Sequence, residues 1–118
     1  MDKKEQAQRE QFNALELEIR ERFKITDPKW FINSTTYYQD YVKIKKMMVF
    51  LCVEHKKIPA SKISLWCKST PPNISYHKKD FKVFLEKRGT HKDSLSQRIL
   101  DFYDGKIKEW EYIVDGVL

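Results

Sequence analysis

Apolar side chains recur at spacings of three and four residues along most of this chain, and this period constrains its fold more than any other feature. Phe12, Leu15, Ile19 and Phe23 form the first such series, among Glu, Gln and Arg residues. A stripe of this kind is typical of an amphipathic helix that covers a core with one face. The 118 residues include only three glycines, so the chain has few of the turns that an all-β fold needs. The pattern therefore predicts an all-α protein.

Similar series divide the rest of the chain into further helices, and we expect a compact bundle of about five or six helices that contains a helix-turn-helix. A chain of this length fits one domain, residues 1–118. Within it we assign 1–26 to an N-terminal amphipathic helix, 35–102 to the helix-turn-helix core and 103–118 to a C-terminal helix. Asp27-Pro28 predicts a short helical turn, and Ser34, Thr35 or Thr36 can cap the long helix that follows.

Positive charge is concentrated in the middle of the chain. The net charge is +6, but residues 41–92 carry 13 Lys or Arg side chains against three carboxylates. Residues 1–40 have a net charge of −1 and residues 93–118 a net charge of −3. We call residues 41–92 the basic segment. A surface of this charge attracts polyanions such as nucleic acids.

The basic segment has the order of elements that a helix-turn-helix requires. A long helix ends near residues 55–57, a short helix with the apolar residues Ile63, Leu65, Trp66 and Cys67 begins at Pro59, and a turn with two prolines leads into a basic helix. If Ile74, Phe81, Phe84 and Leu85 face the core, the polar residues between them face outward. Lys side chains suit phosphates, and Asn, Ser and Tyr suit groove contacts. The residues expected to contact DNA are Lys45, Lys46, Lys56, Lys57, Lys62, Thr70, Asn73, Ser75, Tyr76, Lys78, Lys79 and Lys82.

Four stretches of this region have apolar and polar residues in the order found in a known protein family. They are residues 45–51 (KKMMVFL), 59–66 (PASKISLW), 74–77 (ISYH) with Phe81 seven residues on, and 93–99 (DSLSQRI). With them, residues 44–102 resemble the C-terminal helix-turn-helix domain of the replication initiator DnaA, a fold shared with the tryptophan repressor. The resemblance implies a duplex DNA-binding domain. The family's base-reading turn, Asp-His-Thr-Thr, is not retained, since residues 70–73 are Thr-Pro-Pro-Asn. A different target sequence, or mainly backbone binding, is therefore expected.

The function predicted from these features is DNA binding by a small transcriptional or replication-related regulator, of the kind that phages and mobile elements encode. The alternative is a non-enzymatic helical adaptor or inhibitor whose basic face docks on an acidic protein. The stripe on the first helix either packs on the domain or pairs with a second copy. A third use of the chain is stacking of single-stranded bases on the aromatic cluster Trp30, Phe31, Tyr37, Tyr38 and Tyr41, although such clusters are more often core with a tyrosine rim.

No enzymatic activity, cofactor or metal is expected. Cys52, His55, Cys67 and His77 lack the paired spacing of a zinc site, and no catalytic group has a diagnostic partner. The chain also has no apolar run of membrane-spanning length, and its N-terminus lacks the apolar core of a signal peptide. These features, with two cysteines that we expect to be reduced core thiols, predict a cytoplasmic protein.

Overall fold

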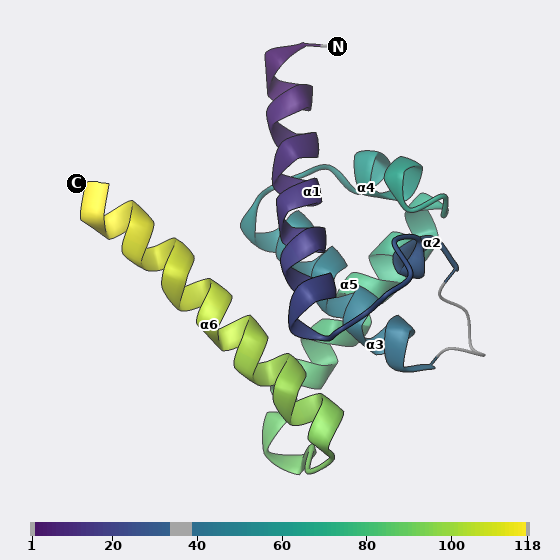
Figure 1. Cartoon of the computed structure of the whole chain (residues 1–118), viewed down its shortest axis with the longest axis vertical. Helices are drawn as coiled ribbons and strands as arrows, with labels where there is room; N and C mark the ends of the chain where they lie inside the picture. The colour runs from purple at the N-terminus through teal and green to yellow at the C-terminus, as the bar shows by residue number, and fades with distance from the viewer. Residues whose placement is uncertain (1, 34–38, 118) are drawn as a thin grey trace.

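The chain folds into helices joined by short connections (Figure 1). The computed structural model describes residues 2–33 and 39–117, with the side chains of 2–32 and 39–111. Over these ranges there is no strand, which confirms the all-α prediction. The caps expected at Ser34, Thr35 or Thr36, and the aromatic pair Tyr37 and Tyr38, lie outside the described residues. The α-helices are α1 (Lys3–Arg22), α2 (Trp30–Asn33), α3 (Gln39–Phe50), α4 (Ala60–Trp66), α5 (Pro71–Glu86) and α6 (Ser94–Val117).

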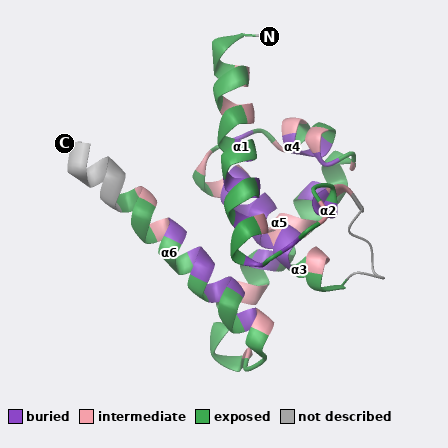
Figure 2. Ribbon diagram, viewed as in Figure 1, coloured by how far each residue is buried: buried purple, intermediate pink, exposed green. Residues whose placement is uncertain are grey.

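Helix α1 covers the core with its C-terminal half, while its first turns are mostly exposed (Figure 2). It begins at Asp2, whose side chain accepts a hydrogen bond from the backbone N–H of Glu5 at 2.7 Å. The predicted stripe is buried within the chain's own core, from Phe12 to Phe23. On α1 the exposed large apolar residue is Leu17 alone. Of the two uses considered for this stripe, packing on the domain is the one observed, and pairing with a second copy stays a prediction.

A short helical turn follows Asp27-Pro28, as predicted, and it is anchored by a buried tryptophan. Trp30 is fully buried, and its Nε1 donates to Glu16 Oε2 at 3.1 Å. The same carboxylate accepts from Arg20 Nε at 2.9 Å. Because a buried carboxylate is stable only when its oxygens are paired, this network fixes α2 to the inner face of α1.

Helix α3 lies at the centre of the bundle and contacts α1, α2, α5 and α6. Its C-terminal half, from Met47 to Phe50, is buried, as are the first residues of the π-helical turn Leu51–His55 that continues it. The Lys56 N–H donates to Leu51 O at 3.1 Å, which closes that turn. The predicted end of this helix near residues 55–57 is confirmed. A helix in the centre of a bundle exposes little of its surface to solvent.

Helices α4 and α5 are joined by the four residues 67–70. α4 is tied to α1 at two points: the Arg9 guanidinium lies 4.9 Å from the centre of the Trp66 ring, and Lys62 pairs with Glu5 at 2.6 Å. Ile63 faces the core as expected, but Leu65 is 68% exposed. The expectation that Leu65 belongs to the apolar stripe is wrong, because a seven-residue helix buries one side through Ile63 and Trp66 and turns Leu65 away.

Helix α6 begins at Ser94 and runs without a break to Val117. The boundary expected between residues 102 and 103 therefore falls inside a continuous helix. Its first half packs on the core through Ile99, Phe102 and Tyr103, and its C-terminal end projects away from the other helices (Figure 1). Within the described residues, none of the helices combines the length and the apolar character needed to cross a bilayer.

Candidate nucleic-acid interface

The solvent face of α5 carries most of the groove-facing residues predicted from the sequence. Asn73, Ser75, Tyr76, Lys79 and Lys82 are exposed, and Tyr76 is 64% exposed. On the opposite side of the helix Ile74 and Phe81 are buried, and Phe84 and Leu85 are packed against the core as expected. The α5 sequence thus separates a core face from a polar face that carries hydrogen-bonding and cationic side chains.

The prolines expected in a turn before α5 are in its first turn. Thr70 is the N-cap, and its hydroxyl oxygen accepts from the Asn73 N–H at 3.3 Å. Pro71 and Pro72 occupy the next two positions. Because proline has no N–H, the start of α5 offers fewer backbone donors to an anion than most helix N-termini do. Phosphate contacts at this end would therefore depend on side chains, and Thr70 acts as a helix cap.

Lys45 does not reach the surface, and its assignment as a phosphate contact is wrong. The residue is 4% exposed. It belongs to the central helix α3, with the buried residues Ile44 and Met47 beside it. Burial lowers the pKa of Lys45, an effect that the nearby Cys67 thiol partly opposes. An ammonium in this position cannot meet a phosphate without disrupting the core.

Three other predicted lysines are engaged in ion pairs on the protein surface. Lys46 pairs with Asp80 at 3.1 Å, Lys78 with Glu54 at 3.1 Å, and Lys62 with Glu5. The pKa of Glu54 is lowered by its hydrogen bond from Lys78. Partly exposed pairs of this kind contribute about 0–1 kcal/mol each, so a phosphate can replace the carboxylate at little cost.

The remaining predicted lysines lie free on the surface or against an aromatic ring. Lys56 Nζ is 4.1 Å from the centre of the Trp110 ring. Lys57, Lys79 and Lys82 are exposed, and no carboxylate of the described residues lies within ion-pair distance of them. Four further lysines, Lys43, Lys68, Lys87 and Lys92, are also exposed and were not among the residues expected to contact DNA. Charge alone could have indicated them, since all four belong to the basic segment.

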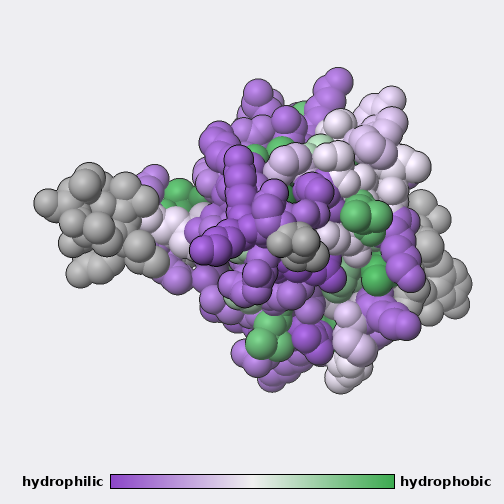
Figure 3. Space-filling view, turned by 90° about the horizontal axis from the view of Figure 1, so that it is seen from above, coloured by the Kyte–Doolittle hydropathy of each residue, from purple (hydrophilic) through white to green (hydrophobic). Residues whose placement is uncertain are grey.

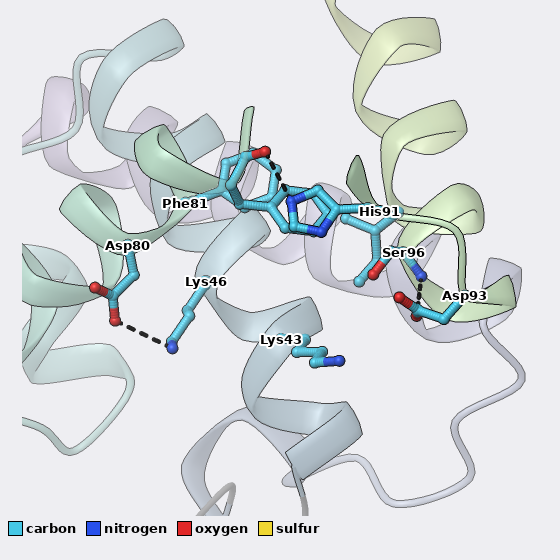
Figure 4. Close-up of a pocket in the computed structure, with 9 residues that line it drawn as sticks. Lys43, Lys46, Asp80, Phe81, His91, Asp93 and Ser96 are labelled. Atoms are coloured by element: carbon cyan, nitrogen blue, oxygen red, sulfur yellow. Dashed lines mark hydrogen bonds and ion pairs between the residues drawn. The ribbon is translucent and has the colours of Figure 1, made fainter. Parts of the chain in front are cut away.

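A cavity of about 220 Å³ lies between α3, α5 and the start of α6 (Figure 4). Phe81, Phe84 and Ile99 form its apolar part, and the Lys46–Asp80 pair lies at one side. His91 Nε2 is 3.1 Å from Phe84 O, and the imidazole stacks on the Phe84 ring with a centroid distance of 4.1 Å. Since a carbonyl oxygen can only accept, Nε2 carries the proton. These contacts hold the C-terminal half of α5 to the segment before α6.

Asp93 fixes the other wall of this cavity by capping α6. Its carboxylate accepts from the Ser96 N–H at 2.9 Å. That backbone hydrogen bond is the main reason why the pKa of Asp93 is lowered. Lys46, Asp80 and Asp93 at the cavity are thus engaged with other groups of the protein.

Two histidines of the basic segment, His55 and His77, have pKa values below the ordinary value. Burial is the main cause that lowers the pKa of His55, and its Nε2 lies 3.0 Å from the Tyr103 hydroxyl. Burial also lowers the pKa of His77, with a further contribution from Lys45 and Lys46. The positive charge of this region at neutral pH therefore comes from Lys and Arg. Among the residues whose side chains are described, no three His, Cys, Asp or Glu side chains gather as a metal site would require.

These histidines predict an acid-dependent loss of stability. Below the ordinary value of 6.5, the unfolded chain binds protons at His55 and His77 that the folded chain does not, so the free energy of unfolding decreases as the pH falls. This window lies above the one governed by Glu54 and Asp93, whose ordinary values are 4.5 and 3.8. We expect the double variant His55→Gln/His77→Gln to lose less thermal stability than the wild type between about pH 6.5 and 5. Melting curves with parallel pH dependence in both proteins would contradict this prediction.

No protein-family model matches the chain, and neither a curated protein nor a solved structure matches it. The assignment of a function therefore depends on the chain's own residues: a polar, basic face on α5, a short helix before it, and exposed lysines on the loops around both.

Proposed function

We propose that the chain binds duplex DNA through the solvent face of α5, with α4 and its flanking loops against the phosphate backbone. The composition of that face is the main support for this proposal. Its exposed residues include Ser75, Tyr76, Lys79 and Lys82, while the opposite side of α5 is buried in the core. The similarity of residues 44–102 to the DnaA DNA-binding domain favours the same use of this helix.

The charge distribution on α5 indicates which end would enter a groove. Polar and cationic residues occupy its first three turns, whereas Val83 and Glu86 are on the exposed side of its last turn. Recognition helices contact bases mainly through their N-terminal residues. We therefore place Ser75 and Tyr76 toward the bases, and Lys79 and Lys82 at the groove edge where phosphates lie.

Lysines outside α5 would bind the phosphate backbone. Lys57 precedes α4 and is exposed, and Lys56 and Lys62 are partly exposed beside it. Pro71 and Pro72 remove backbone N–H donors from the start of α5, because proline has no N–H. Phosphate binding therefore depends on lysine ammonium groups, which neutralise phosphates without reading sequence. Affinity should depend strongly on salt and weakly on the base sequence.

Docking on an acidic protein is the second candidate, and Leu65 favours it. A leucine that is 68% exposed on α4 is more usual in a protein interface than against a phosphate backbone. Figure 3 shows that the face of the molecule seen from above is mainly hydrophilic, with small separate hydrophobic patches. No broad apolar surface is visible on that face.

Selection from a random duplex library separates these functions. Retention of duplexes with an enriched motif supports a sequence-specific regulator, and weak retention without a motif supports an architectural protein. If no duplex is retained at low salt, the DNA-binding proposal is wrong and the acidic-protein partner becomes the better candidate.

A further inference from the structure

Three lysines of this chain have a left-handed backbone conformation, which L-residues other than Asn and Asp rarely adopt. Their φ angles are 54° at Lys24, 57° at Lys57 and 51° at Lys68. Each lysine comes directly after the C-cap of a helix, namely Phe23, Lys56 and Cys67. Glycine is the usual residue at this position because a Cβ is crowded there by the backbone. At all three sites the chain carries a long cationic side chain where glycine would be less strained.

The backbone hydrogen bonds show that the helix ends impose this conformation. After α4, the Lys68 N–H donates to Leu65 O at 3.3 Å and the Ser69 N–H donates to Ser64 O at 2.8 Å. After α1, the Lys24 N–H donates to Glu21 O at 3.3 Å and the Ile25 N–H to Arg20 O at 2.9 Å. Both pairs of bonds form the same helix-ending motif. The motif requires a left-handed residue, but it does not require a lysine.

Lys57 and Lys68 lie on either side of α4, inside the basic segment. Both are exposed, and no carboxylate among the described residues is within ion-pair distance of either. A cation near a helix C-terminus gains some energy from the helix dipole, but this gain is smaller than the strain of the left-handed residue. Lys24 has the same left-handed conformation outside the basic segment, so the feature that distinguishes Lys57 and Lys68 is that they flank α4 within the basic segment.

We infer that Lys57 and Lys68 form a phosphate clamp, in which the two ammonium groups bind the DNA backbone from the two ends of α4. This inference rests on the proposed function. Helix α4 has seven residues and is therefore about 10 Å long. The two left-handed lysines lower the stability of the fold and supply two contacts with the phosphates.

Lys24 provides the matched control for this inference. It has the same backbone conformation and the same helix-ending motif as Lys68, and it is also exposed. However, it belongs to residues 1–40, whose net charge is −1, and it lies outside the basic segment. Its substitution tests the effect of strain without a change in the basic surface.

The experiment combines thermal melting with duplex binding over a range of salt concentrations, using the full chain and a short mixed-sequence duplex. Lys57→Gly/Lys68→Gly should raise Tm by several degrees, because glycine relieves the strain at both sites. It should also reduce the slope of log affinity against log salt by about two, one for each lost phosphate contact. Lys24→Gly should raise Tm by about half as much and leave both affinity and slope unchanged.

A charge-retaining variant separates loss of the ammonium from a change in backbone flexibility. Lys57→Arg/Lys68→Arg keeps both cations and should bind with the wild-type salt slope. The inference is overturned if the double glycine variant binds with the affinity and slope of the wild type, or if its Tm falls. If the wild type itself binds no duplex at low salt, the proposed function fails and the clamp fails with it, whereas wild-type binding with an unchanged slope in the variant refutes the clamp alone.

Discussion

Reversal of charge at Lys79 and Lys82 together should reduce duplex affinity by about 30-fold or more. Both side chains are exposed on the polar face of α5. They are three residues apart and therefore on the same side of the helix. Loss of two phosphate contacts worth roughly 1 kcal/mol each corresponds to about 30-fold, and the introduced carboxylates add repulsion. Binding of a mixed-sequence duplex by Lys79→Glu/Lys82→Glu, measured at low salt, tests this prediction.

The fold should tolerate this reversal. Neither lysine has an ion pair among the described residues, and surface substitutions of this kind change the free energy of unfolding by about 0.5 kcal/mol or less. The matched control is Lys29→Glu/Lys108→Glu, which reverses two exposed lysines outside the basic segment. Equal losses of affinity in the two double variants would show that net charge alone governs binding, and that α5 has no special role.

Truncation of Phe81 should have the largest effect on stability among substitutions in α5. The side chain is 2% exposed, and its ring contacts those of Phe50, Phe84 and Tyr103 at centroid distances of 5.3 to 5.4 Å. Phe→Ala changes in cores lower the free energy of unfolding by about 3–5 kcal/mol. This is a large part of the roughly 5–15 kcal/mol that stabilises a typical domain. Denaturant unfolding of Phe81→Ala measures the effect.

Val83→Ala is the control on the same helix. Val83 is 40% exposed, so its truncation should change the free energy of unfolding by less than about 1 kcal/mol. If Phe81→Ala were no more destabilising than Val83→Ala, the core face of α5 would be wrongly assigned, and with it the polar face that we propose for DNA.

The amphipathic helices were predictable because their apolar period is long enough to define a face. The stripe of α1 and the pair Ile74 and Phe81 in α5 are buried as expected. The helical period did not predict the exposure of Leu65 in α4. A helix of seven residues has fewer than two full turns, so its period cannot distinguish a buried leucine from an exposed one.

The burial of Lys45 was not predicted from the sequence either. Lys45 and Lys46 are adjacent in sequence, and both were expected to contact phosphates. The structure separates them: Lys46 pairs with Asp80 on the surface and Lys45 is buried, since α3 is surrounded by α1, α2, α5 and α6. Which helix becomes central is a property of the tertiary arrangement, and a local charge pattern does not determine it.

The left-handed lysines could not be predicted at all. The sequence signal for such a position is Gly or Asn just after a helix, and Lys57 and Lys68 carry the opposite signal. Their conformation became apparent only from the backbone, although their charge had already placed them in the basic segment. Lys57 was expected from its charge to contact DNA, whereas nothing in the sequence indicated its backbone conformation.

If exposed lysines around α4 and α5 bind the DNA backbone, wild-type binding to a mixed-sequence duplex should weaken steeply as the salt concentration rises. Four of these lysines, Lys57, Lys68, Lys79 and Lys82, are exposed and have no ion pair among the described residues. Four phosphate contacts predict a slope of about −3 to −4 in a plot of log affinity against log salt concentration. A slope near zero, or no binding at low salt, would show that these lysines do not bind the DNA backbone.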